Sequence, residues 1–207
     1  MKKRKLKKNV IFILITIILV AGIYSSYKLF FDTNEVKEVK ILHKIKGYGY
    51  ELKDSKSARY KKMFYELEKI LKKSTVDEEA YVKKITNMFI YDFYTLDNKT
   101  AKTDVGGTDF IYKEILGNFL ENAENTFYKY VESNIYNQRK QKLPSVDKIK
   151  ISSVKTEEFK YGDKTDEEAY IVNVSWNYTD SKYDDYQKEA TLVFIHNGKR
   201  LDLVELK

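Results

Sequence analysis

The chain has 207 residues, a third of them charged, and it contains no cysteine, which excludes disulfide bonds and a lipid-modified cysteine anchor. Its formal net charge is +7, but all 31 acidic residues lie at or beyond Asp32. Seven of the 38 lysines and arginines precede that residue, so residues 32–207 are formally neutral. A neutral domain lacks the basic excess that nucleic-acid binding requires, and we expect no nucleic-acid partner.

The first predicted element is a transmembrane helix over residues 9–27. These nineteen residues are uncharged and mostly aliphatic, and residues 1–8 before them carry six lysines and arginines. About 20 apolar residues cross a bilayer, and the basic flank predicts a cytoplasmic stub with the rest of the chain outside the cytoplasm. Ala21-Gly22 would suit cleavage of a signal peptide, but the apolar run continues to Tyr27, which favours a retained anchor. An exported chain without cysteine is typical of a Gram-positive surface.

A polar linker over residues 28–35 leads to an extracytoplasmic domain that is predicted to cover residues 36–207. Residues 36–53 alternate apolar and polar side chains and are interrupted at Gly47 and Gly49, which predicts a strand or a short hairpin. About 170 residues are enough for one domain with its own core.

Three helices are predicted next. Apolar residues at three- and four-residue spacing place the first over residues 57–73. Thr75 and Glu78 form a capping box that opens the second helix. Thr108 or Asp109 caps the third and longest helix, which we expect to end among residues 134–142.

The remainder of the chain predicts an antiparallel sheet. Alternating segments cover residues 149–151, 170–178, 190–196 and 201–203. Asn197-Gly198 is a strong hairpin signal, because both positions of the favoured turn need positive φ. This turn predicts a register in which Phe194 faces Leu201 and His196 pairs with Lys199.

This order of elements predicts an α+β fold in which helices cover one face of an antiparallel sheet. It resembles the NTF2-like (cystatin-like) fold. With the basic stub and single anchor it resembles the VirB8 and TcpC class of conjugation and secretion subunits. The resemblance covers residues 1–207 as an order of elements and includes no motif. It implies a single-pass membrane protein that contacts other envelope proteins and forms homo-oligomers.

Residues that could carry chemistry are few. His43 and His196 are the only histidines, and no spacing of histidines and carboxylates matches a zinc site. The usual signatures of nucleophilic catalysis are absent as well. We therefore expect no catalytic residues, no metal and no cofactor. Asp92, the only carboxylate embedded in the apolar helical pattern, is the one candidate for an inward-pointing acid or base.

Residues 97–109 are the most unusual segment, because thirteen non-periodic residues separate two predicted helices. Gly106-Gly107 before a helix could present amides to an anion, but two nearby aspartates would repel phosphate. We expect a turn followed by a helix cap. If one loop contacts a partner, we expect this one, through Asp97, Asp104, Gly106, Gly107 and Asp109.

Two functional hypotheses follow. The leading one is a non-enzymatic, membrane-anchored assembly subunit whose outer domain binds envelope proteins. The alternative is a tethered NTF2-like module that binds a ligand or catalyses a reaction, which requires a deep cavity with a buried polar group. A solid aromatic core between the helices and the sheet would exclude the alternative.

Overall fold

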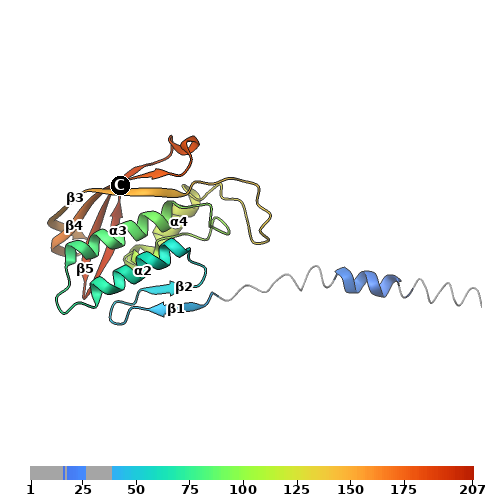
Figure 1. Cartoon of the computed structure of the whole chain (residues 1–207), viewed down its shortest axis with the longest axis horizontal. Coiled ribbons are helices and arrows are strands. Elements are labelled where there is room, and N and C mark those ends of the chain that lie inside the picture. Colours follow the sequence, from blue (N-terminus) through green and yellow to red (C-terminus); the bar gives the residue numbers. More distant parts are fainter. Residues whose placement is uncertain (1–15, 17, 27–38) are drawn as a thin grey trace, which may run out of the picture. The chain divides into compact units, whose positions relative to one another are not determined.

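The computed structural model describes residue 16, residues 18–26 and residues 39–207. It divides into two units, Met1–Lys40 and Ile41–Lys207, and the second is the folded domain (Figure 1). The predicted stub, the predicted linker and half of the predicted span lie outside the described residues. Residues 18–26 are helical. No helix within the described ranges is both long and apolar enough to cross a membrane.

The folded domain begins with a short antiparallel hairpin of β1 (Ile41–Lys44) and β2 (Glu51–Lys53), one of the two forms predicted for this segment. Gly47 and Gly49 lie between the strands with φ of +84° and +74°, which other residues rarely adopt. Helix α2 (Ala58–Leu71) follows, and the Ser57 side chain accepts a hydrogen bond from the Tyr60 amide at its start.

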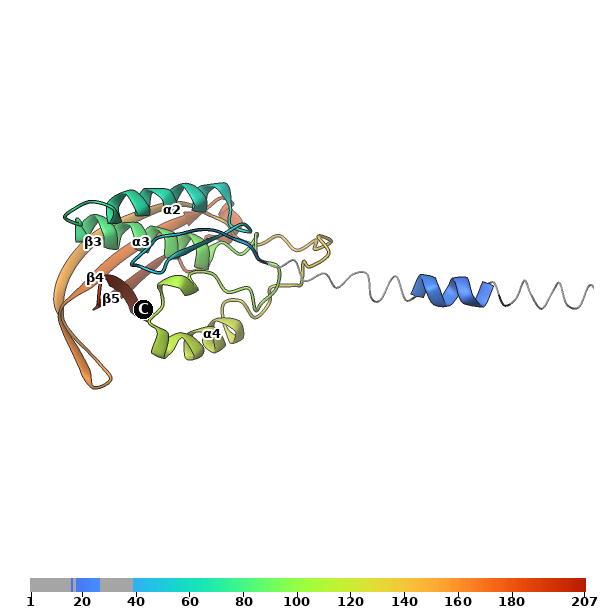
Figure 2. The ribbon, with the colours of Figure 1, turned by 90° about the horizontal axis from the view of Figure 1, so that it is seen from below.

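Helix α3 (Glu78–Tyr94) is the central helix of the domain. Its N-cap is Asp77, whose carboxylate accepts a hydrogen bond of 2.9 Å from the Ala80 amide, so the capping box predicted at Thr75 is wrong. Aspartate is a better N-cap than threonine, which explains the later start of the helix. Most residues from Tyr81 onward are buried, because α3 lies between α2 and the sheet (Figure 2).

The third predicted helix is wrong in length. Residues 108–125 form two 3-10 turns, η1 (Thr108–Phe110) and η2 (Lys113–Ile115), and a helix of ten residues, α4 (Leu116–Asn125). Helix geometry is interrupted where Ile111 forms a parallel bridge to Leu203 and the Tyr112 amide donates to the Leu203 carbonyl at 2.9 Å. Pairing with the sheet edge therefore overrides the helical periodicity.

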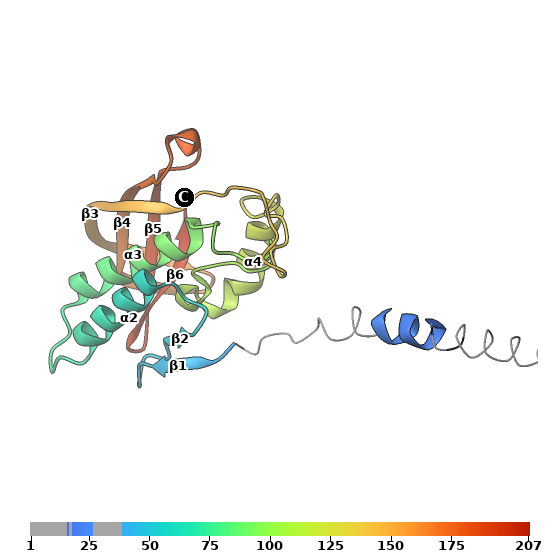
Figure 3. The ribbon, with the colours of Figure 1, turned by 45° about the vertical axis from the view of Figure 1, so that its right-hand side comes forward.

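Four antiparallel strands form the sheet in the order β3-β4-β5-β6 (Figure 3). They are β3 (Val146–Tyr161), β4 (Lys164–Tyr178), β5 (Glu189–Asn197) and β6 (Arg200–Leu206), with the 3-10 turn η3 (Ser181–Tyr183) between β4 and β5. The pairing of β4 with β5 begins at Tyr170, so the tip of the β3–β4 hairpin extends past the other strands.

The last hairpin forms where it was predicted, but its predicted register is wrong. Phe194 pairs with Leu203, and His196 pairs with Leu201. The two loop residues are Gly198 and Lys199, and Gly198 has φ of +63° at the first loop position, as in a type II′ turn. Either register keeps apolar residues on the core face, so the alternating pattern does not distinguish them.

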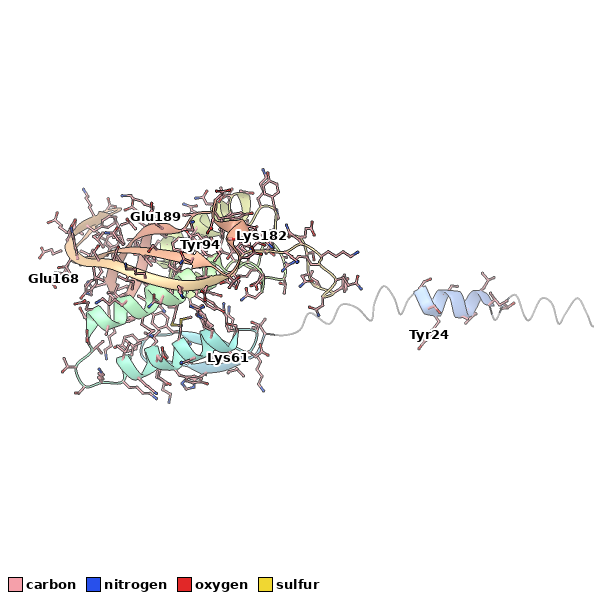
Figure 4. The ribbon with its side chains drawn as sticks, turned by 45° about the horizontal axis from the view of Figure 1, so that its top comes forward. Tyr24, Lys61, Tyr94, Glu168, Lys182 and Glu189 are labelled. Carbon is pink, nitrogen blue, oxygen red and sulfur yellow. The ribbon has the colours of Figure 1, made fainter. Side chains whose placement is uncertain are left out.

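The main core lies between α3 and the face of the sheet that carries Val172, Trp176 and Phe194. Tyr94 at the end of α3 contacts Trp176 with ring centroids 4.2 Å apart, and Figure 4 shows Tyr94 in the interior while Lys61 and Glu168 lie at the surface. A smaller cluster covers the opposite face. The prediction of an α+β fold with helices against an antiparallel sheet is confirmed.

Candidate functional site

The loop over residues 97–109 is held to α3 by a buried ion cluster. Asp92 is 3% exposed, and its carboxylate lies 2.6 Å from the Lys56 ammonium and 3.1 Å from the Lys99 ammonium. The Gly107 amide donates a third hydrogen bond of 2.8 Å to it. Burial alone would raise the pKa of Asp92, but the two lysines and the amide lower it to about 2.

Gly106 and Gly107 fit against α3 because they have no side chains. A Cβ on Gly106 would lie 2.0 Å from the Asp92 carbonyl oxygen, and one on Gly107 would lie 2.6 Å from the Phe89 ring. The Gly106 amide donates to the Tyr128 hydroxyl at 3.0 Å, and the Gly107 amide is used by Asp92. Both amides that could have faced an anion are therefore paired within the protein.

The structure separates the five residues predicted as a partner-contact set. Asp97 and Asp104 are exposed, the two glycines are buried, and Asp109 is partly buried. Burial raises the pKa of Asp109, with Lys53 and Lys56 opposing this effect. Only Asp97 and Asp104 have exposed side chains, and the buried half of the loop holds it on α3.

The two histidines lie on different elements. The imidazole of His43 in β1 is 2.7 Å from the carboxylate of Glu68 in α2. His196 in β5 lies 2.9 Å from the Asp166 carboxylate, and it does not pair with Lys199 as predicted. Asp166 belongs to β4, where the register brings it beside His196.

His196 also lies 3.4 Å from the Glu78 carboxylate at the start of α3, and the Tyr170 hydroxyl donates to the same carboxylate at 3.0 Å. Burial would lower the pKa of His196, but the two carboxylates raise it. The cluster joins α3 to the sheet. Within the described part of the chain, no group of three or more carboxylate, histidine or cysteine side chains could hold a metal ion.

A cavity of about 570 Å³ lies beside the β6 edge of the sheet, and its volume is in the range of small-ligand sites. Apolar side chains from α3, α4 and β6 form much of its wall. They include Phe93, Tyr94, Phe119, Ala123, Leu203 and Leu206. The cavity therefore separates α4 from β6, whereas the space between α3 and Trp176 is filled by aromatic packing.

Polar side chains also line this cavity. Asn118, Asn122 and Gln187 are exposed lining residues with amide side chains. Tyr94 is 1% exposed, burial raises the pKa of its hydroxyl, and no hydrogen bond to this hydroxyl forms within the described residues. The cavity thus combines an apolar wall, a buried tyrosine and three exposed amide side chains.

The edge of the sheet is paired at Leu203, by Ile111 and Tyr112, but it is open further along β6 at Leu206, beside this cavity. Lys207 exchanges both backbone hydrogen bonds with Thr191, at 2.9 and 3.0 Å. Because bonded and non-bonded pairs alternate in an antiparallel ladder, the backbone groups of Leu206 point away from β5. A strand edge of this kind can accept a further strand.

Sequence reasoning identified Asp92 as an embedded carboxylate but missed both lysines that pair with it. Lys56 and Lys99 lie 36 and 7 residues away along the chain and carry no periodic signal. The cavity was missed because it forms between α4 and β6. Asn118 and Asn122, spaced four residues apart on α4, are the one local hint of a polar rim.

Comparison of the chain with protein-family models, with curated proteins and with solved structures gives no match.

Proposed function

We propose that residues 9–27 hold this protein in a membrane as a single-pass anchor and that its domain, outside the cytoplasm, acts as a non-enzymatic assembly subunit. The partners are other envelope proteins of a complex such as conjugation or secretion machinery, and copies of the same chain. The NTF2-like and VirB8/TcpC-type relationship belongs to this proposal. The anchor rests on the sequence: six basic residues precede nineteen uncharged ones, and all basic excess precedes Asp32.

The observation that carries the contact function is the open edge of β6 next to the apolar cavity. An extended segment of a partner can pair with the free backbone groups of Leu206 and insert an apolar side chain toward Phe93 and Phe119. Backbone pairing supplies affinity, and the cavity selects the side chain.

The test is photo-crosslinking of the full chain in intact cells. A photoreactive amino acid at Asn122, beside the cavity, is expected to crosslink an envelope protein, while the same amino acid at Lys62 on the outer side of α2 is expected to give none. Equal yields from both positions, or recovery of monomer alone, would contradict the assembly role.

A second candidate function is the binding of a small ligand in the same cavity. The hydroxyl of Tyr94, a buried residue of the lining, favours it, because a ligand with a hydrogen-bond acceptor would pair with a group that has no protein partner among the described residues. Native mass spectrometry of the protein extracted from its own membranes distinguishes the candidates. A bound small molecule that is lost in an Ala123→Phe variant would favour the ligand over the partner segment.

A further inference from the structure

The three most exposed large apolar side chains among residues 41–207 lie close together in the sequence. Tyr130, Ile135 and Tyr136 are 76%, 65% and 62% exposed. All three belong to the segment between α4 and β3, in residues 129–142, which we name the 129–142 loop. Exposed apolar side chains are common singly, but a group of them indicates a contact surface.

Hydrogen bonds fix the loop in the conformation that exposes these side chains. The Arg139 guanidinium donates to the backbone carbonyls of Asp97, Lys99 and Glu132, at 2.7, 2.8 and 3.2 Å. The Gln141 side chain bonds the backbone at Tyr130 and Glu132, and the Asn134 amide donates to the Thr100 carbonyl at 2.7 Å. The loop is thus fixed on its inner side and presents its apolar side chains outward.

The backbone next to Tyr136 supports the same interpretation. Asn137 has φ of +55° and is the one non-glycine residue with positive φ in the part of the chain that the structure describes. Such a conformation costs free energy and persists where surrounding contacts determine it. The loop therefore holds a specific shape at the position where its apolar side chains gather.

The charge of the loop identifies what it can contact. Its basic residues are Lys129, Arg139, Lys140 and Lys142, and Glu132 is its only acid. The three lysines are exposed, and the Lys129 ammonium lies 5.2 Å from the centre of the Tyr130 ring. Tyrosines with lysines around them suit the interfacial region of a bilayer, where rings sit among headgroups and ammonium groups face anionic phosphates.

The position of the loop agrees with this chemistry. Strand β1 begins at the end of the folded domain that carries the 129–142 loop (Figures 1 and 2). Ile41 and Leu42 at this point are 50% and 47% exposed. Fourteen steps of chain separate Ile41 from Tyr27, the end of the proposed anchor, and they reach at most about 50 Å when fully extended.

We propose that the 129–142 loop rests on the anionic lipid surface of the membrane that holds the anchor. This inference depends on the proposed anchoring, and it assigns a second, reversible membrane contact to the folded domain. The contact orients the domain, because the loop lies at one end of it. The β6 edge and its cavity are then presented to partners at a defined angle to the bilayer.

The absence of cysteine makes a direct test possible, since a single introduced cysteine labels one position. Full-length Tyr136→Cys and, as the matched control, Tyr186→Cys are labelled with an environment-sensitive nitrobenzoxadiazole dye and reconstituted in vesicles. Tyr186 is 46% exposed and lies in a different loop, between η3 and β5. The vesicles contain phosphatidylcholine alone or with phosphatidylglycerol, and a share of lipids carries a nitroxide quencher near the headgroup.

The expected result is blue-shifted emission and strong quenching at position 136, greater with phosphatidylglycerol, and neither effect at position 186. Lys140→Gln combined with Lys142→Gln is expected to weaken the contact about fivefold for each lysine. If the protein sediments with vesicles but both positions are quenched equally, or position 136 does not respond to phosphatidylglycerol, the lipid contact of the loop is overturned.

Failure to sediment with vesicles overturns the proposed anchor, and this inference with it. A label at position 136 that is water-exposed in pure vesicles but protected in native membranes would assign the loop to a protein partner instead.

Discussion

Replacing Asp92 with asparagine tests whether the buried ion cluster stabilises the domain. Asparagine keeps an acceptor for the Gly107 amide but leaves the Lys56 and Lys99 ammonium groups without their counter-charge. Removing one partner of a buried ion pair costs about 3–5 kcal/mol. The pKa of Asp92, about 2 against an ordinary 3.8, corresponds to about 2 kcal/mol of that stabilisation. We expect Asp92→Asn to lower the free energy of unfolding by about 3 kcal/mol at neutral pH.

The pH dependence of this difference provides a second readout. Because folding lowers the pKa of Asp92, its stabilising effect is present above about pH 4 and is lost as the pH falls toward 2. The difference in free energy of unfolding between wild type and Asp92→Asn should therefore decrease as the pH falls from about 4 to 2.

The assay is urea unfolding of the full chain in detergent, followed by the fluorescence of Trp176, the only tryptophan. The control is Asp147→Asn, an exposed aspartate for which we expect a change below about 0.5 kcal/mol. The reasoning would be refuted if Asp92→Asn lowered the free energy of unfolding by less than about 1 kcal/mol. It would also be refuted if the difference in free energy of unfolding between wild type and variant stayed constant as the pH falls.

Four further predictions concern other parts of the domain. Gly107→Ala should destabilise it by about 2–4 kcal/mol, because its φ is +74° and the Cβ would overlap the Phe89 ring. Gly198→Ala, with φ of +63° and open space around it, should cost only about 1 kcal/mol in the same urea assay. Folding raises the pKa of His196, so protonated His196 stabilises the domain fully below about pH 6.5, and this stabilisation is lost as the pH rises through the pKa of the folded state. The melting temperature of His196→Asn, measured by thermal unfolding, should not show this decrease at higher pH. Arg200→Met should lower the melting temperature, measured by circular dichroism, because the guanidinium bonds the Tyr48 and Asp109 carbonyls and lies 4.4 Å from the Tyr50 ring centre.

Local patterns were sufficient for much of the fold. The three- and four-residue spacing around Phe64 and Leu67 predicted α2 to within a few residues, because a helix that buries one face must repeat its apolar side chains at that interval. Alternation predicted the long strands for the same reason, with a period of two. The Gly198 turn was visible because positive φ is a local requirement.

The candidate site could be predicted only in fragments. Gly106 and Gly107 stood out in the sequence, but the reason for glycine at these positions is their close packing on α3. A Cβ at either position would overlap α3. Asp92 was visible as an embedded carboxylate, while its partners Lys56 and Lys99 become neighbours only when the chain folds.

The sequence by itself determined the charge asymmetry, the predicted anchor, the α+β class and the order of the elements, since these depend on composition and short-range periodicity. The tertiary structure decided the length of α4, the register of the last hairpin and the cavity beside β6. The length of α4 and the cavity depend on contacts between segments distant in sequence. The hairpin register depends on the turn, because the alternating pattern fits either register. Ile111 shows the effect of distant contacts most directly, because its bridge to Leu203 interrupts the predicted helix near its start, between η1 and η2.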